Sequence, residues 1–374
     1  MLGDFKHIRN LYREISELPK LGKEYCVAFV YNSAEFIRDT VHATECIYPN
    51  ELHMILSSFR ASVEYVYPFD GENTFIANIP ILQKKHNYVL VYSMAQNVNG
   101  IGRRCIVPLA CDYYDLINIG ADFMTCVYGG SKALMYEKTK CLQGVTFPES
   151  YYIFEDCDLE NLLKKDLPGQ WLLKPNDESA SIGVEVFSPK DYSKEALKNL
   201  LTQYKKRFPI FCVQEYIEGE EVAVPLLWFH GKYYCPGVSE VVFQTDHHYL
   251  DYDTIALGNC SYKEYDGLCS ERLVNASVEV AKALNYRAIS RIDFRIKDGV
   301  GYIEDIGPNP TISEHNGANE LFRLRLNAKG CCVYQLITCE VIVAAFTSKR
   351  IAPKLKLLPD ELSGSKIYVK LSGI

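Results

Sequence analysis

RIDFRIKDGVGYIEDIGPNP, residues 291–310, is the stretch that decides how the second half of the chain folds. Two apolar-rich runs flank KDGVG, whose Asp-Gly step is typical of a tight turn, so the pattern predicts a β-hairpin. Because side chains alternate between the faces of a strand, Arg291, Asp293 and Arg295 share one face. The second strand brings Glu304 and Asp305 next to it. The hairpin is therefore predicted to carry a charged face.

The carboxylates of this face repel one another and require a compensating cation. A Mg²⁺ ion held by one or two carboxylates and by substrate phosphates is one compensator. Salt bridges from Arg291 and Arg295 are the other, and such ion-pair networks also occur without any function. The hairpin alone leaves both interpretations open.

Bulk properties narrow the class of protein. A chain of 374 residues predicts two or three domains. The net charge of −7 argues against a nucleic-acid partner, and no apolar run approaches the length of a membrane span. The first residues lack the apolar core of a signal peptide. The 14 cysteines show neither CxxC pairs nor zinc-site spacing. We expect reduced thiols and a cytoplasmic location.

The first third of the chain predicts a small doubly wound domain. Residues 4–18 have the spacing of an amphipathic helix. YCVAFVYN, at 25–32, is an apolar run typical of a strand buried on both faces of a parallel sheet. Similar runs at 63–69 and 87–94 alternate with helical segments, which indicates βαβ units.

Glu35 follows the first buried strand, where α/β sheets bind ligands. Ser33 is suited to cap a helix at this point. Glu35 in the first turn either compensates the helix dipole at the surface or contacts a substrate.

Two lysines stand at positions suited to an anion. Ser131 is suited to cap a helix ending near Gly144, and Lys132 in its first turn opposes the helix dipole unless an anion lies nearby. Lys174 ends the apolar strand WLLK and precedes the small-residue loop NDESASIG, whose backbone amides could fold over phosphates. An inward lysine there needs a counter-ion. The alternatives are a solvated Lys132 and a structural Lys174.

The segment 211–229 predicts two strands separated by a polar break at 214–221. Its Gln-Glu pair and later Glu could hydrogen-bond a purine edge and a ribose diol. The alternative is a hairpin with solvated acids.

In this order and spacing, the motifs resemble those of the ATP-grasp superfamily, in particular its D-alanine–D-alanine ligase branch. The segments that carry the resemblance are SAE (33–35), GIGRR (100–104), GADFMTCVYGGSK (120–132), KPNDESASIG (174–183), QEYIEGEE (214–221), PGVSEVV (236–242), RID (291–293) and DIGPNP (305–310). The likeness covers roughly residues 25–330. It implies an α/β (α+β) ATP-grasp fold: a Rossmann-like domain at 1–125, then α+β subdomains at 126–210 and 211–374 that clamp ATP.

The resemblance also implies roles for individual residues. Those expected to bind ATP are Lys132, Lys174, Ser181, Gln214, Glu215, Ile217 and Glu221, with the lysines on phosphates, 214–217 on adenine and Glu221 on ribose. Asp293 and Asp305 would hold Mg²⁺, or Mn²⁺ instead. The family's third ligand falls on Gly307, and we hypothesise that Asn309 or a water takes its place. Arg291 would stabilise the oxyanion of an acyl phosphate, and Glu35 would orient a substrate amino group. Lys174 and Arg291 are the expected catalytic residues.

Departures from the family pattern bear on the substrate. Ala180 replaces a serine of the phosphate loop. In the lid segment YLDYDTIA, at 249–256, Ile255 and Ala256 replace a lysine and a tyrosine. Gly307 replaces the metal-binding asparagine, and Ser131 replaces the aspartate before the first lysine. We therefore predict that D-alanyl-D-alanine is not the product.

The sequence thus predicts an ATP-dependent carboxylate–amine ligase that forms an amide or peptide bond through an acyl phosphate. Its expected partners are small molecules, a carboxylate and an amine, and the expected substrate is an amino acid or small peptide. The protein could also assemble as a homodimer. Two alternatives stay open: a degenerate ATP-grasp protein that binds nucleotide without ligase activity, and a D-alanine–D-alanine ligase with an altered lid.

Overall fold

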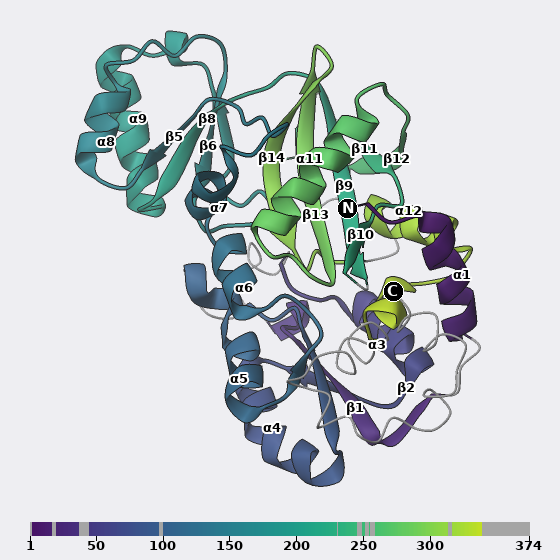
Figure 1. The fold of residues 1–374 in the computed structure, drawn as a ribbon. Coiled ribbons are helices and arrows are strands. Elements are labelled where there is room, and N and C mark those ends of the chain that lie inside the picture. The colour runs from purple at the N-terminus through teal and green to yellow at the C-terminus, as the bar shows by residue number, and fades with distance from the viewer. Residues whose placement is uncertain are drawn as a thin grey trace.

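The computed structural model describes residues 2–16, 20–36, 45–96, 100–229, 231–244, 249–250, 254, 259–312 and 316–338. Three sheets organise these residues (Figure 1), and the predicted mixture of a parallel sheet with α+β units is observed. Each of the cysteines in the described ranges is a free thiol. None of the helices there combines the length and the apolar character that a membrane span needs.

A four-stranded parallel sheet occupies the N-terminal part, in the strand order β2-β1-β3-β4. Its strands are β1 (Leu21–Tyr31), β2 (Val63–Asp70), β3 (Tyr88–Ser93) and β4 (Ile117–Asn118). The helical elements of this part are η1 (Ala34–Phe36), α3 (Pro49–Ser62), α4 (Glu72–Lys85), η2 (Ile101–Arg104), α5 (Ile106–Tyr114) and α6 (Phe123–Gly129). The predicted βαβ alternation is therefore confirmed.

Strand β1 is buried on both faces, as its apolar sequence predicts. Val27 and Phe29 pack with Phe59 of α3 on one face. Ala28 and Val30 pack with residues of α4 and α5 on the other. This double burial fixes the sheet, so that the ends of β3 and β4 can form one wall of a cavity.

The second sheet is antiparallel, in the order β5-β8-β6-β7. It lies with α8 and α9 at the upper left of Figure 1. Its elements are α7 (Lys132–Thr139), β5 (Ser150–Ile153), α8 (Asp156–Leu162), β6 (Trp171–Pro175), β7 (Glu185–Phe187), η3 (Pro189–Asp191), α9 (Lys194–Arg207) and β8 (Phe211–Glu215). Helix α7 ends at Thr139, before the expected Gly144, and strand β5 begins at Ser150. Because β8 pairs with β5 and β6, this sheet extends past residue 210.

The third sheet has the order β12-β11-β9-β13-β14, with β10 paired to β9. Its strands are β9 (Glu220–Phe229), β10 (Lys232–Tyr234), β11 (Val238–Phe243), β12 (Cys260–Tyr265), β13 (Ile289–Lys297) and β14 (Val300–Pro308), and its helices are α11 (Ser270–Ala283) and α12 (Gly317–Leu326). The predicted hairpin is β13–β14. Asp298 and Gly299 both adopt positive φ, of 52° and 74°, as a two-residue type I′ turn requires.

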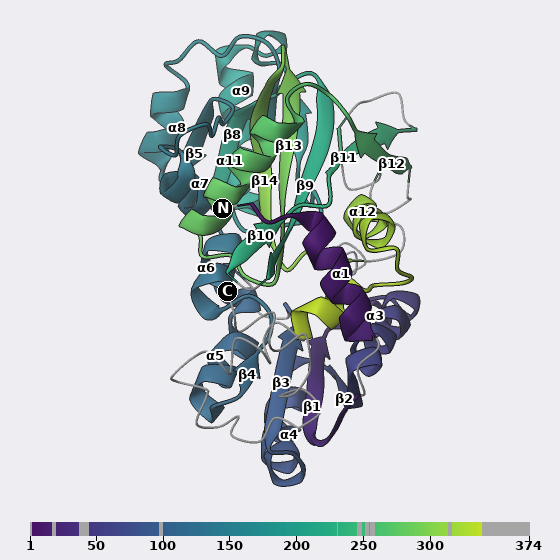
Figure 2. The same ribbon diagram turned by 45° about the vertical axis from the view of Figure 1, so that its right-hand side comes forward.

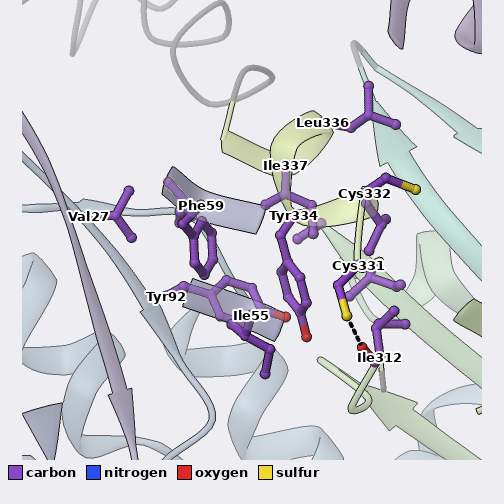
Figure 3. Close-up of a cluster of buried hydrophobic side chains, with 14 of the residues drawn as sticks. Val27, Ile55, Phe59, Tyr92, Ile312, Cys331, Cys332, Tyr334, Leu336 and Ile337 are labelled. Atoms are coloured by element: carbon purple, nitrogen blue, oxygen red, sulfur yellow. Dashed lines mark hydrogen bonds between the residues drawn. The ribbon is translucent and has the colours of Figure 1, made fainter. Parts of the chain in front are cut away.

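One hydrophobic cluster joins the two ends of the described chain to the parallel sheet. Helix α1 (Phe5–Ser16) packs against α12, beside which it lies in both Figures 1 and 2. Tyr334 packs with its ring centroid 5.2 Å from those of Phe59 and Tyr92 (Figure 3). This cluster therefore ties the parallel sheet to the part of the chain that carries β13 and β14.

Candidate active site

Two adjoining cavities lie between the sheets. The first, which we call the junction cavity, has a volume of about 310 Å³ and is lined by residues from the parallel sheet, from the loop 176–184 and from β9, β11, β13 and β14. The second, the lysine cavity, has a volume of about 140 Å³ and lies between β6, the same loop and the β13–β14 hairpin. Both are lined by Ser179, Ala180, Glu221, Leu250, Arg291, Asp293 and Asp305. Chemistry that involves both cavities would take place at these shared residues.

A β-bulge places two neighbouring acids on one side of the hairpin. Asp293 pairs with Asp305 and Phe294 pairs with Ile303, so Glu304 has no partner across the hairpin. Without the bulge, Glu304 and Asp305 would point to opposite faces. With it, both line the lysine cavity. The hairpin therefore presents three carboxylates to this cavity, those of Asp293, Glu304 and Asp305.

Arg291 compensates Asp293 through two nitrogens. Its Nε and Nη2 each donate to the Asp293 carboxylate at 2.8 Å. The carboxylate raises the pKa of the Arg291 guanidinium further, while burial raises the pKa of Asp293 above its ordinary value, against the opposing effect of Arg291. The salt bridge from Arg291, which was one of the two interpretations of the charged hairpin face, is thus present. It does not use Asp305, whose carboxylate has no ion pair within the described ranges.

Lys174 is buried, with 8% of its surface exposed. Its Nζ donates to Gln214 Oε1 at 2.6 Å and to Glu304 Oε2 at 2.5 Å. The other carboxylate oxygen, Glu304 Oε1, is buried and finds no hydrogen-bond partner among the described residues. An unsatisfied buried oxygen beside a lysine is costly without a ligand or water.

Lys132 is held at the start of α7 by Asn176. The Asn176 Oδ1 accepts from the Ser131 hydroxyl at 3.1 Å and from the Ala133 amide at 3.0 Å. Ser131 caps the helix by accepting from the Leu134 amide, as expected. The Lys132 Nζ donates to the Glu178 carbonyl at 2.5 Å. Burial lowers the pKa of this lysine, so its ammonium form would gain from an anion.

Glu221 forms a buried ion pair with Arg295. The Arg295 Nη1 lies 3.2 Å from Glu221 Oε2, and its Nη2 donates to the Gly219 carbonyl at 3.1 Å. Burial nevertheless raises the pKa of the Glu221 carboxyl from 4.5 to about 7. Arg295 acts in the opposite direction but does not cancel the effect.

This raised pKa predicts a pH-dependent loss of stability. Between about pH 4.5 and pH 7 the folded chain binds the Glu221 proton more tightly than the unfolded chain, so stability falls as pH rises through that window. Each pKa unit corresponds to about 1.4 kcal/mol, and each kcal/mol to roughly 2–4 °C in Tm. We expect Glu221→Gln to remove part of the Tm decline of the wild type between about pH 5 and pH 7. The exposed neighbour is the control: Glu220→Gln should keep the wild-type profile. Identical slopes in all three proteins would contradict the assignment.

The loop 176–184 carries two residues in a strained conformation. Ala180 and Ser181 adopt φ of 50° and 56°, which non-glycine residues rarely do. The Ser181 hydroxyl donates to the Leu250 carbonyl at 2.7 Å. Such strain persists only where the surroundings enforce it, and it is frequent at ligand-binding loops.

The structure brings most of the predicted site residues together. The residues that line the lysine cavity are Lys132, Lys174, Ser181, Glu221, Arg291, Asp293 and Asp305. Gln214 lines a small neighbouring cavity with both lysines. Glu215 and Ile217, at the end of β8 and just after it, are not among the residues that line these cavities.

Two further predicted residues, Asn309 and Glu35, are not among those that line the lysine cavity. Asn309 lines the junction cavity, and its Oδ1 accepts from the Ala121 amide at 3.1 Å. Glu35 lies in η1 with an exposed side chain and is not among the residues that line the junction cavity. The lid positions Ile255 and Ala256 lie outside the described residues.

Glu45 is a site residue that the sequence analysis missed. Its carboxylate accepts from the Ser179 amide at 3.1 Å and from the Ser179 hydroxyl, and it forms a 3.2 Å ion pair with Arg103. Its side chain is 4% exposed and lines the junction cavity. Ser179 lies 134 residues further along the chain, so no local pattern links the pair.

The residues of the lysine cavity fit a metal-bound nucleotide. Asp293 and Asp305 face one another across the hairpin and offer the oxygen ligands that Mg²⁺ prefers. Within the described ranges, no group of three or more His, Cys, Asp or Glu side chains is arranged as a metal site. Two carboxylates suffice when phosphates complete the shell. Buried Lys174 and half-buried Lys132 are the cations that such phosphates require.

Comparison with known proteins identifies the family. The model of the "D-ala D-ala ligase C-terminus" family matches residues 155–341, which is half of the chain. A D-alanine–D-alanine ligase of Fervidobacterium nodosum is 29% identical over 148 residues, 38% of this chain and 45% of that protein. One from Flavobacterium psychrophilum is 27% identical over 214 residues, 54% of this chain and 61% of that protein. The chain thus spans about half the length of the curated relatives it matches.

Solved structures show the same fold over most of the chain. A D-alanine–D-alanine ligase of Bacillus anthracis, complexed with ATP, superposes with a TM-score of 0.63 at 14% identity, covering 87% of this chain and 99% of that one. The VanG D-Ala:D-Ser ligase of Enterococcus faecalis gives a TM-score of 0.60 at 14% identity, covering 86% and 99%. These likenesses confirm the expected ATP-grasp architecture. The chain belongs to the D-alanine–D-alanine ligase family and has its ATP-grasp fold.

Proposed function

We propose that this protein is an ATP-dependent carboxylate–amine ligase that joins two small substrates through an amide or peptide bond. The observation that carries the proposal is the convergence of half-buried Lys132, buried Lys174, Arg291 and two facing carboxylates around the lysine cavity. Arg291 and the two carboxylates also line the junction cavity. An amino acid or small peptide is the substrate class that the family favours. Lysines, an arginine and carboxylates are the side chains suited to a reaction whose catalysis is positioning and charge neutralisation.

The lysine cavity would hold ATP between the segments 130–210 and 211–330. When bound, Mg·ATP supplies the phosphoryl group that activates the substrate carboxylate. Lys132 and Lys174 would bind the phosphates, and Ser181 lies in the loop beside them. Asp293 and Asp305 would hold Mg²⁺ or Mn²⁺, with Asn309 near them. The segment 214–217 and Glu221 would bind the adenine and the ribose.

Arg291 would act on the substrate carboxylate. It lines both cavities, so its guanidinium is available to the oxygen that becomes negatively charged when the amine attacks. Asp293 orients it by accepting two hydrogen bonds. Glu35 stays a proposal for the substrate amino group, and Glu45, which lines the junction cavity, is a second candidate for that role. A cytoplasmic location, a homodimer and a division of the chain near residues 125 and 210 are further proposals.

A nucleotide-binding protein without ligase activity is the second candidate. It is favoured by Gly307, which offers no side-chain oxygen, and by Asn309, whose amide oxygen already accepts from Ala121. An altered D-alanine–D-alanine ligase is a third.

The three are separated by Mg·ATP-dependent phosphate release across a panel of amino acids and dipeptides, with product masses. Release with amide formation supports the ligase, and release with D-alanine alone identifies the altered D-alanine–D-alanine ligase. ATP binding without release on any member of the panel supports the binding protein.

Lys174→Ala is expected to weaken ATP binding at least tenfold, about 1.4 kcal/mol or more, because Lys174 is a buried cation that lines the lysine cavity. Calorimetry with a non-hydrolysable ATP analogue measures the affinity. Lys198→Ala, at an exposed position of α9, is the matched control and should bind as the wild type does. Unchanged affinity in a Lys174→Ala protein of normal Tm would remove Lys174 from the nucleotide site.

A further inference from the structure

Two consecutive arginines of η2 have different partners. Arg103 contacts two carboxylates, with its Nη1 3.2 Å from Glu45 Oε2 and 3.1 Å from Glu178 Oε2. Its Nη2 also donates to the Asp177 carbonyl at 2.5 Å. The charge of Arg103 is therefore compensated within the protein.

Arg104 is bonded to neutral groups only, as far as the described ranges extend. Its Nε donates to the Gln96 side-chain oxygen at 2.9 Å, and its Nη2 donates to the Ser179 hydroxyl at 3.1 Å. Glu45 and, more weakly, Asp305 attract it electrostatically. The Glu45 carboxylate is bonded to Arg103 and Ser179, and among the described residues no hydrogen bond or ion pair joins Arg104 to Asp305. Arg104 is thus a half-buried cation from which no carboxylate of the described residues accepts a hydrogen bond.

The position of Arg104 supplies a reason for this arrangement. It lines the junction cavity together with Gln96, Ser179 and Glu45. Burial lowers the pKa of its guanidinium, which reflects an uncompensated desolvation cost. A buried charge is normally paired, and the planar guanidinium is the side chain best matched to a carboxylate. The missing partner is therefore expected to come from the cavity.

We infer that Arg104 binds a carboxylate of a substrate other than the carboxylate that reacts. This inference rests on the proposed function and names a substrate class for it. The reacting carboxylate belongs beside Arg291 on β13, where the two cavities meet. Arg104 comes from η2, on the wall that the N-terminal part of the chain contributes. Besides the reacting carboxylate, the two substrates together therefore carry one that does not react.

Two sources of this carboxylate share the same chemistry. It is either the side chain of a dicarboxylic acyl donor or the α-carboxylate of an amino-acid acceptor. Matched ligand pairs distinguish them. Aspartate against asparagine and glutamate against glutamine test the donor, and alanine against alaninamide tests the acceptor, each in the D and L forms.

The experiment is calorimetry on the full chain saturated with Mg²⁺ and a non-hydrolysable ATP analogue. We expect the acid of one pair to bind about tenfold or more tightly than its amide, because a hydrogen bond to a charged group contributes roughly 1.5–3 kcal/mol. Arg104→Gln should abolish that preference, while affinity for the ATP analogue stays unchanged. Arg104→Lys, which keeps the charge but loses the planar fork, should retain a reduced preference.

Controls keep the outcomes separate. Arg207→Gln removes a charge from an exposed arginine of α9 and should behave as the wild type. A wild type that binds every amide as tightly as its acid, or binds no member of the panel, overturns the inference, as does an Arg104→Gln protein that keeps the preference. If Arg104→Gln fails to fold, the test rests on two measurements: the acid-over-amide preference of the wild type and its reduction in Arg104→Lys. An Arg104-dependent acid preference without phosphate release on any substrate would instead overturn the proposed ligase function and leave Arg104 as a carboxylate-binding residue of the junction cavity.

Discussion

Asp305→Asn is expected to lower the rate of phosphate release by about two to three orders of magnitude at saturating Mg²⁺, with little change in Tm. Asp305 faces Asp293 across the hairpin and lines both cavities. Removing one of two facing carboxylates leaves the triphosphate charge poorly neutralised as transfer begins. The fold should be spared because the amide has the size of the carboxylate, and no described residue forms an ion pair with Asp305.

Direct metal binding separates this explanation from a general defect. Mn²⁺ binding in the presence of the ATP analogue, followed by electron paramagnetic resonance, should weaken in Asp305→Asn. Asn309→Ala is the comparison variant, and we expect it to cost less in both measurements, because its oxygen is already bonded to the Ala121 amide. An Asp305→Asn protein that turns over and binds Mn²⁺ as the wild type does would refute the metal assignment.

Local patterns predicted the parts of the fold that local physics determines. The Asp298–Gly299 step specifies a two-residue turn, because both residues tolerate positive φ better than others do, and the hairpin followed. Strand β1 could be predicted because burial on both faces leaves a continuous apolar run. The cap at Ser131 is likewise a contact between residues three positions apart.

Features of the site that depend on tertiary contacts could not be predicted from local sequence patterns. The bulge that turns Glu304 into the lysine cavity depends on how β13 and β14 register, which alternation alone cannot reveal. Glu45 reaches Ser179 across the junction between two parts of the chain, so no local pattern points to it. Glu35 can be proposed from the sequence because it follows the first buried strand. Helix α7 ends early because turn residues at 140–144 replace its last expected turn, and propensity arguments place such ends poorly.

The difference between Arg103 and Arg104 shows why a motif does not settle specificity. The sequence offers GIGRR as a loop with two equivalent cations. In the folded protein, Glu45 and Glu178 form ion pairs with Arg103. Arg104 donates its hydrogen bonds to neutral groups instead. Family membership fixes the fold, whereas the proposed choice of substrate depends on such neighbours.

Arg291→Lys is expected to reduce kcat by about 10² while changing the affinity for the ATP analogue little. Lysine keeps a positive charge beside Asp293 and so avoids leaving a buried carboxylate unpaired. It cannot present the planar fork that binds Asp293 through Nε and Nη2 and still offers a donor to the substrate oxygen. Loss of one well-placed donor to a developing oxyanion typically costs 10²–10³ in rate.

The split between kcat and nucleotide affinity tests this role. Arg325→Lys, at the surface of α12, serves as the control for the substitution itself and should leave both quantities unchanged. If Arg291 only held Asp293 in place, Arg291→Lys would weaken Mn²⁺ binding in the same measure as Asp305→Asn, and its kcat would recover at higher metal concentration. A kcat that stays low at saturating Mg²⁺, with normal Mn²⁺ and nucleotide binding, places the lost interaction in the transition state. A kcat equal to that of the wild type would remove Arg291 from the catalytic residues.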